Sequence, residues 1–415
     1  MTGPIARTIE DDELADWLYV PRTAMLGAPP DEETVERMRE RVQLDRCVAA
    51  FDGSPDGRPV GSAGSFHAPV AVPGGRVDAG AVTAVGVLPT HRRQGHLSRM
   101  MQLQLADIAE RDEPIAILVA AEYPIYGRFG YGPATDAAGV RIDTSAPDLW
   151  VDPPTGRIEL VDDNVAFTKA LVDVYARVWS TIPGHLEYED WRWPVQTGEV
   201  EGTFGSSEER RSRTKVVWRD AAGEVGGVAA YTVKDEWQDN RPQGELRCEH
   251  LVTATAEAER ELVRYMSEVD WTARVVLQLR PVDEPVALWL RDGRRAVIID
   301  RSDHCWIRVL DVAAALTARR YAADGRLVLE IDDPMGFANG RYALEGGPDG
   351  ALCTPTDDDP DLVLDVKALG SAYLGGHTWH RLAAGGWVSE ARAGALERAS
   401  TMFTSPRAPW CALTF

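Results

Sequence analysis

Between residues 81 and 108 the apolar positions change from the alternation of a strand to the spacing of a helix. Thr83, Val85 and Val87 lie two apart, and Pro89 then interrupts the pattern. One face of a helix follows, formed by Leu97, Met101, Leu105 and Ile108. The pattern therefore predicts a strand that ends near Val87 and a helix that begins at about Gly95.

A continuous apolar run, residues 114–121 (PIAILVAA), comes after this helix. Such a run is typical of a strand that is buried on both faces. Strand, helix and strand then form a βαβ unit, so the two strands are expected to be parallel, with a right-handed crossover.

The corner between the first strand and the helix has the composition of an anion site. It contains Arg92, Arg93, Gln94 and Gly95, and no carboxylate lies between Pro89 and Gln104. The first N–H groups of a helix lack partners and carry the positive end of the dipole, so this corner suits a phosphate group. The alternative is a corner without a ligand, whose arginines are simply solvated.

The remaining pattern places this unit within a larger domain. Two helical patterns occupy residues 11–45, and strands at 46–52 and 58–66 form a hairpin around a turn at 53–57. A similar order returns after a breaker-rich segment at 151–156. It consists of a helix at 165–179, strands at 215–219, 225–233 and 244–253, a helix at 256–268 and a strand at 273–280.

The corner of this second repeat differs from the first. It has no glycine, and Glu257 and Glu259 fall in the first turn of the helix. Carboxylates there stabilise the helix by opposing its dipole, and they repel a phosphate for the same reason. We therefore expect the second repeat not to bind such a ligand.

The last part of the chain has a third character. We expect a strand at 305–310, an alanine-rich helix at 311–320, strands at 326–331, 341–344 and 362–366, and short helices at 369–373, 378–384 and 391–403. This order is that of an α+β domain.

Composition narrows the function. The net charge of −21 argues against a nucleic-acid partner and is compatible with a cationic substrate or with plain solubility. Five widely spaced cysteines imply neither a disulfide framework nor a zinc site, and the histidines, His377 and His380 included, lack metal spacing. No signal-type or membrane-spanning run is present, so we expect a cytoplasmic protein without a membrane partner.

The pattern from Val85 to Leu97 resembles motif A of the GCN5-related N-acetyltransferases (GNAT), whose loop holds the pyrophosphate of acetyl-CoA. With the motifs THRRQGHL, IYGRFGYG and LGSAYLGG and the tail beginning RAPW, the whole chain resembles the Eis-like acetyltransferases. The resemblance implies a mixed α/β (α+β) chain with tandem GNAT-like domains at 1–152 and 153–300, the second without the CoA loop. A sterol-carrier-like domain at 301–415 presents the C-terminal carboxylate.

The resemblance also implies which residues act. Tyr126 is the general acid, with Tyr123 and Tyr131 as rivals and packing in an aromatic cluster as the alternative. The α-carboxylate of Phe415 is the base, unless the end of the chain is frayed. Acetyl-CoA, the co-substrate, is expected to contact three sets of residues: Val85, Gly86 and Val87 at the pantetheine arm; Arg93, Gln94, Gly95, His96, Leu97 and Ser98 at the pyrophosphate; and Ala121 and Glu122 beyond the next strand. No metal is expected.

The resemblance also implies a class of substrate. Eis-like enzymes acetylate amines of aminoglycosides, often at several positions, and assemble as homohexamers. Here residues 20–30 contain no carboxylate and Thr414 precedes Phe415, which departs from the acidic cleft of the family. Trp17, Met25, Phe66 and Trp410 are candidate wall residues, or core. The alternatives are a lysine N-acetyltransferase acting on proteins or peptides, and a non-catalytic acyl-CoA or lipid-binding scaffold.

Overall fold

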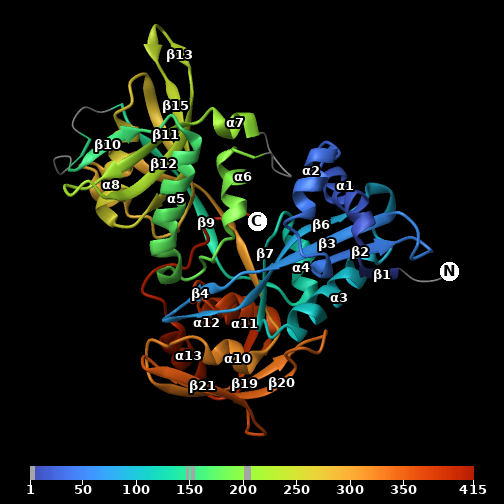
Figure 1. The fold of residues 1–415 in the computed structure, drawn as a ribbon. Coiled ribbons are helices and arrows are strands. Elements are labelled where there is room, and N and C mark those ends of the chain that lie inside the picture. The colour runs from blue at the N-terminus through green and yellow to red at the C-terminus, as the bar shows by residue number, and fades with distance from the viewer. Residues whose placement is uncertain (1–4, 146–148, 151–154, 201–206) are drawn as a thin grey trace. The chain divides into compact units, whose positions relative to one another are not determined.

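The computed structural model describes residues 5–145, 149–150, 155–200 and 207–415 (Figure 1). The expected domain boundary at 152–153 lies outside these residues. The chain forms two compact units. The first comprises residues 1–135, 304–409 and 413–415, and the second comprises 136–303 and 410–412.

A seven-stranded sheet forms the centre of the first unit, in the order β1-β2-β3-β6-β7-β18-β8. Its strands are β1 (Ile5–Thr8), β2 (Cys47–Phe51), β3 (Pro59–His67), β6 (Ala79–Val87), β7 (Ile115–Val119), β18 (Cys305–Val309) and β8 (Gly132–Pro133). The predicted hairpin is confirmed, because β2 pairs antiparallel with β3. The predicted βαβ unit is confirmed as well, since β6 and β7 are parallel.

Helices cover both faces of this sheet (Figure 1). A Cβ on Gly61 would lie 2.9 Å from the Met100 side chain of α3 (His96–Glu110), whereas one on Gly64 would lie 3.1 Å from Trp17 of α1 (Leu14–Ala24). These two positions of β3 are three residues apart and point to opposite faces, so α1 and α3 lie on opposite sides of the sheet. A second N-terminal helix, α2 (Glu32–Arg39), also forms, as predicted.

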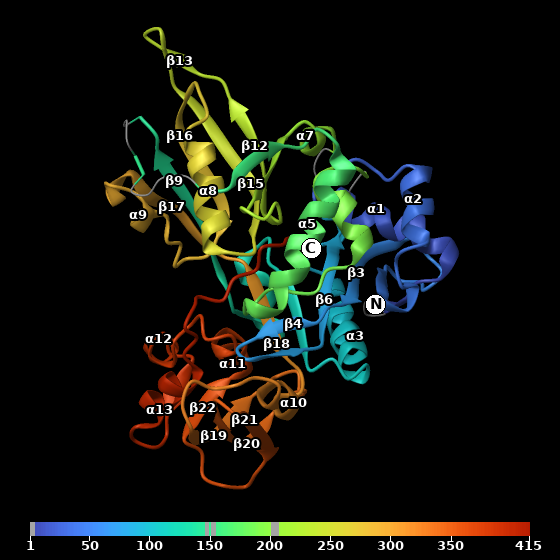
Figure 2. The ribbon, with the colours of Figure 1, turned by 60° about the vertical axis from the view of Figure 1, so that its left-hand side comes forward.

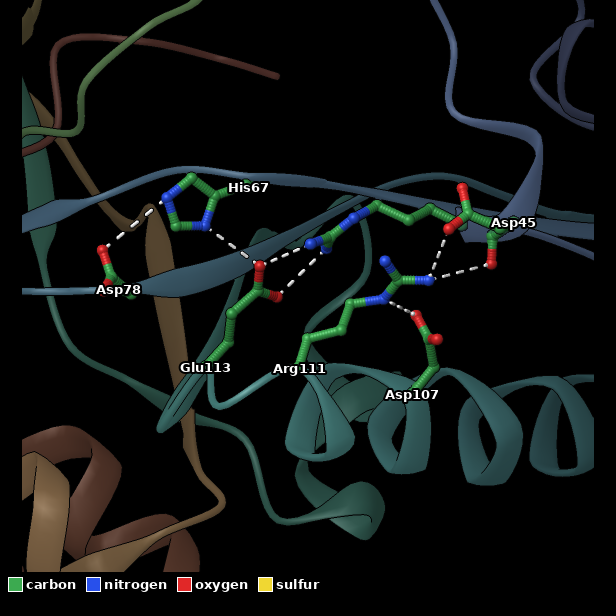
Figure 3. A network of polar contacts seen from close by, with 7 residues as sticks. Asp45, His67, Asp78, Asp107, Arg111 and Glu113 are labelled. Atoms are coloured by element: carbon green, nitrogen blue, oxygen red, sulfur yellow. Dashed lines mark hydrogen bonds and ion pairs between the residues drawn. The ribbon is translucent and has the colours of Figure 1, made fainter.

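A polar network fastens the end of the βαβ unit that is remote from the phosphate corner (Figure 3). Arg46 and Glu113 form a buried ion pair of 2.6 Å. His67 Nδ1 lies 3.0 Å from the same carboxylate, and Arg111 at the end of α3 pairs with Asp45 at 2.8 Å. Residues next to β2, β3, α3 and β7 are thereby joined, which fixes the helix relative to the strands.

The second unit repeats the architecture of the first. Its seven-stranded sheet has the order β10-β11-β12-β15-β16-β9-β17, and α5 (Asn164–Val178) and α8 (Ala256–Ser267) lie on its two sides (Figure 2). Its strands are β10 (Arg157–Leu160), β11 (Thr214–Arg219), β12 (Val225–Lys234), β15 (Gly244–Thr253), β16 (Thr272–Arg280), β9 (Asp136–Asp143) and β17 (Ala296–Asp303). In both sheets an antiparallel meander leads into a parallel pair joined by a helix.

One strand of each sheet comes from an unexpected part of the chain. β9 follows the first βαβ unit in sequence but pairs with β16 and β17 of the second sheet. β18 follows the second repeat but pairs with β7 and β8 of the first sheet. The sequence had placed residues 305–310 in the C-terminal domain, and the structure places Cys305–Val309 in the first sheet instead.

The C-terminal domain contains a five-stranded sheet in the order β21-β20-β19-β22-β23. The strands are β21 (Gly350–Pro355), β20 (Gly340–Gly347), β19 (Gly325–Asp332), β22 (Leu362–Asp365) and β23 (Val388–Glu390), with helices α10 (Val312–Thr317), α11 (Val366–Ala372), α12 (Trp379–Ala384) and α13 (Ala395–Phe403). The helix predicted at 311–320 is shorter than expected, and β21 was not predicted.

Two close approaches join this domain to the first sheet. A Cβ on Gly370 of α11 would lie 2.2 Å from the carbonyl oxygen of Ile307 in β18, so only glycine fits there. Arg308 of β18 and Asp333 form an ion pair of 2.7 Å with both side chains fully buried. The first sheet and the C-terminal domain therefore belong to one unit.

Candidate functional site

The two central strands of the first unit separate after a short ladder. β6 and β7 pair only from Ala79 to Ala81 of β6, where the last pair is Ala81 with Ile117. β6 continues to Val87 along β3, and Ala84 has a φ of 51° at an irregularity of that ladder. Ser62 Oγ donates to the Ala84 carbonyl at 2.8 Å. The backbone of Val85, Gly86 and Val87 is therefore not paired with β7.

The helix that follows β6 begins without a side-chain cap. Gly95 is its N-cap residue with a φ of 90°, and no acidic residue lies in the first turn. Arg93 also has a positive φ, of 63°. The N–H groups of the first turn have no intrahelical acceptors, so this terminus retains its capacity to bind an anion.

The side chains at this corner divide between solvent and core. Arg93, Gln94 and Ser98 are exposed, whereas Leu97 packs against the core cluster that also contacts Val85 and Val87. His96 is buried, and neither ring nitrogen has a hydrogen-bond partner among the described residues. Burial lowers the pKa of His96, so the ring is neutral. The positive charge of the corner therefore comes from arginine and from the helix terminus.

Tyr126 lies at the end of a short helix, α4 (Tyr123–Tyr126), and packs into that same cluster. Its ring meets the Tyr131 ring edge to face, with centroids 6.0 Å apart. Burial, with a smaller contribution from Glu122, raises the pKa of Tyr126 to about 12. The phenol is therefore protonated throughout the physiological pH range.

The two rival tyrosines have different surroundings. Tyr123 is 53% exposed and packs against the Trp306 ring. Tyr131 is fully buried, and burial raises its pKa well above the ordinary value. Ala121 and Glu122 are exposed between β7 and α4. Among the three tyrosines, Tyr126 alone combines a protonated, largely buried phenol with a position at the edge of the cluster.

The C-terminus is held by specific contacts within the first unit. The Phe415 ring packs edge to face on Phe66, with centroids 5.8 Å apart. Phe66 is opposite Ala81, the last β6 residue paired with β7, so Phe415 lies near the point where these strands separate. His304 Nε2 lies 3.0 Å from the Leu413 carbonyl oxygen, which adds a second contact. Sequence reasoning missed His304, because no pattern links it to the tail.

The candidate wall residues do not share one environment. Trp17 is core, with its indole donating to the Val48 carbonyl at 2.9 Å. Trp410 belongs to the second unit. Met25 is 43% exposed, and Phe66 is the residue against which Phe415 packs.

The corresponding corner of the second unit is closed. The Thr255 hydroxyl caps α8 by accepting from Ala258 N, and Glu257 and Glu259 lie in the first turn, as predicted. β15 and β16 also separate, after the pair Cys248–Leu277. Here Arg280 fills the gap: it donates to the Leu251 carbonyl and pairs with Glu259 and Glu284.

The described residues include no group of three or more His, Cys, Asp or Glu side chains able to hold a metal ion. The five cysteines all lie within the described residues, where they are buried and form no disulfide. His377 is buried beside Arg381, and His380 is exposed and pairs with Glu397. In the described part of the chain, no helix is long and apolar enough to cross a membrane.

Comparison with known families defines the class. The family described as an acetyltransferase (GNAT) domain matches residues 6–134, and a second family with the same description matches residues 184–309. A sterol carrier protein domain matches residues 312–412. The tandem architecture expected from the sequence is thereby confirmed, and the second match includes β18.

Individual relatives narrow this class. An uncharacterized N-acetyltransferase of Streptomyces avermitilis is 39% identical over 416 residues, covering 98% of this chain and 97% of the relative. The N-acetyltransferase Eis of Mycobacterium tuberculosis is 32% identical, covering 98% of each chain. The crystal structure of Eis1 from Mycobacterium abscessus superposes with a TM-score of 0.84 at 31% identity, over 99% of this chain and 100% of that one. The chain belongs to the Eis-like GNAT N-acetyltransferases, enzymes that transfer an acetyl group from acetyl-CoA to an amine.

Proposed function

We propose that this enzyme acetylates primary amines of a polycationic small molecule such as an aminoglycoside, at one or several positions. The uncapped terminus of α3, beside the parted strands β6 and β7, is the observation that carries the proposal. The backbone of Val85, Gly86 and Val87 pairs with the pantetheine arm. The pyrophosphate is received by Arg93, Gln94, Gly95, His96, Leu97 and Ser98, and Ala121 and Glu122 complete the contacts.

The chemistry assigns one role to each end of the site. The amine nitrogen forms a bond to the thioester carbonyl carbon, and the bond from carbon to sulfur breaks. Tyr126 gives its proton to the leaving sulfur, and the Phe415 carboxylate accepts the proton that the attacking nitrogen loses. The raised pKa of Tyr126 keeps its proton in place until that sulfur becomes negative.

The charge of the chain supports a cationic substrate. A net charge of −21 attracts polyamines and raises their local concentration at low ionic strength. Residues 20–30 contain no carboxylate, so recognition of an aminoglycoside would depend on other acidic groups than those at the family position.

A thiol-release assay with acetyl-CoA tests the substrate class. Kanamycin-like compounds, linear polyamines and lysine peptides are compared at equal concentration, and we expect the first group to turn over fastest. Faster turnover of lysine peptides would instead identify a protein acetyltransferase. If acetyl-CoA binds but no amine causes release of its thiol, the protein is a non-catalytic scaffold.

Tyr126→Phe tests the acid, and Tyr123→Phe is its matched control because Tyr123 is exposed. We expect at least a hundredfold lower kcat in the first variant at unchanged acetyl-CoA affinity, and wild-type activity in the second. An amidated C-terminus is expected to lower kcat similarly. Full activity of Tyr126→Phe would remove this residue from the mechanism.

We also propose, on the family resemblance alone, that six copies assemble in solution. Light scattering would give six times the 45.5 kDa chain mass. A monomer mass would overturn this proposal without affecting the chemistry.

A further inference from the structure

The second unit has an occupant in the place where its central strands separate. Trp410, from the C-terminal tail, belongs to this unit. Its indole N–H donates to the Leu279 carbonyl of β16 at 2.7 Å, and its backbone N–H donates to Pro183 at 2.8 Å. Leu279 lies beyond the last β15–β16 pair, Cys248–Leu277, so the indole binds the part of β16 that has left the ladder.

Side chains of the second unit complete this binding site. The Trp410 ring centroid lies 4.9 Å from that of His185, and the Arg280 guanidinium lies 5.0 Å over the ring. Arg280 is itself fixed by Glu284 at 2.6 Å and by Glu259. Trp410 is 9% exposed, so the contacts bury nearly all of it. A buried aromatic ring with a satisfied N–H and a cation on its face is a strong anchor.

We propose that the second GNAT-like unit is a receptor for the chain's own C-terminal tail, with Trp410 as the anchor, at the position that corresponds to the separation of β6 and β7 in the first unit. Trp410 and Arg280 together lie where, in the first unit, we propose that the coenzyme binds. Trp410 is thereby a positioning residue, because the five residues after it end in the Phe415 carboxylate. This consequence for catalysis rests on the proposed role of Phe415 as the base.

The remaining tail contacts agree with this assignment. Residues 413–415 belong to the first unit, where His304 contacts Leu413 and Phe66 contacts Phe415. The tail is therefore held on both sides of residues 411–412. Loss of the Trp410 anchor frees residues 410–412, so the position of the terminal carboxylate then depends on the contacts of Leu413 and Phe415 alone.

Two variants of the full chain test the proposal. Trp410→Ala removes the anchor. Trp410→Phe keeps a ring for the tilted contact with His185 but loses the donor to Leu279, and it replaces the alanine variant if that variant does not fold. Trp271→Phe is the matched control, since Trp271 is a 67% exposed tryptophan of the same unit.

Carboxypeptidase release of Phe415 reports on docking independently of catalysis. We expect release at least tenfold faster in Trp410→Ala and severalfold faster in Trp410→Phe, with no change in Trp271→Phe. We expect kcat to fall in the same order while acetyl-CoA affinity stays constant. Unchanged release in both Trp410 variants would overturn the receptor. Faster release with unchanged kcat would uphold the receptor and overturn the role of Phe415.

Discussion

The two GNAT-like units differ at the helix N-terminus that lies beside their separating strands. Each has a parallel pair of strands that separates beside a helix N-terminus. In the first unit that terminus is uncapped and free of carboxylates, whereas in the second Thr255 caps it and two glutamates share its first turn. The strand separation at which we propose that the coenzyme binds in the first unit is bridged by Arg280 in the second, so we infer that the same fold can bind a coenzyme or form an internal contact.

The buried ion pairs show the same contrast. The first unit places Arg46 and Glu113 at the end of the βαβ unit that is remote from the helix terminus (Figure 3). The second unit places Arg280, Glu259 and Glu284 at the terminus itself. Both sets stabilise the strand–helix packing, but only the first leaves the terminus accessible to an anion.

Among the variants that test this comparison, Arg280→Met should lower the free energy of unfolding the most. The substitution leaves Glu284 and Glu259 without their cation, and an uncompensated buried charge costs about 3–5 kcal/mol. Thermal or urea unfolding of the full chain would detect the loss as an early transition. Arg93→Met, which changes an exposed arginine in the first unit, is the control and should leave stability unchanged while weakening acetyl-CoA binding.

Acidification should weaken the second unit through His250. Burial, with a smaller contribution from Arg213, lowers the pKa of this ring from 6.5 to about 4. Between these pH values the unfolded chain binds more protons at His250 than the folded chain does. The free energy of unfolding is therefore highest above pH 6.5 and decreases as the pH falls toward 4. This decrease is at most about 3 kcal/mol. The free energy of unfolding should change less between pH 7 and pH 4.5 in His250→Gln than in the wild type. An equal change in both proteins would contradict the assignment to His250.

Ser98→Glu transfers the chemistry of the second corner to the first. Ser98 is exposed in the first turn of α3, so a carboxylate there stabilises the helix by roughly 0.5 kcal/mol but repels the pyrophosphate. We expect acetyl-CoA affinity measured by calorimetry to fall about thirtyfold, which corresponds to about 2 kcal/mol. Ser98→Gln introduces a side chain of nearly the same shape as glutamate but without its charge, so this variant should bind acetyl-CoA much more tightly than Ser98→Glu. Equal affinities of the two variants would show that charge at this position has no role.

Thr255→Ala should give the smallest effect. It removes the side-chain cap of α8 and should lower the free energy of unfolding by about 1 kcal/mol. Acetyl-CoA affinity should not change, because we propose that the coenzyme binds only to the first unit. Weaker acetyl-CoA binding in this variant would contradict the proposal that only the first unit binds the coenzyme.

Local sequence patterns predicted the corners well. The helix after β6 begins at His96, one residue later than expected, and the acidic first turn of α8 was predicted from Glu257 and Glu259, whereas the Thr255 cap was not predicted. These features depend on residues that are close in sequence. The periodicity and capping rules therefore describe them adequately.

Long-range features could not be predicted in the same way. β9 was not predicted, and β18 was predicted as a strand of the C-terminal domain, because nothing in their residues indicates which sheet accepts them. The tail has no periodicity at all, so the contacts of Trp410 with Leu279 and of Phe415 with Phe66 appear only when distant segments are brought together.

Amide hydrogen exchange with and without acetyl-CoA tests the central claim most directly, because it locates the bound coenzyme within the chain. We predict added protection in the peptides that cover Val82–Val87 and the first turn of α3, with none in those that cover Leu251–Glu259. Protection of the second set, or of both sets equally, would contradict the account.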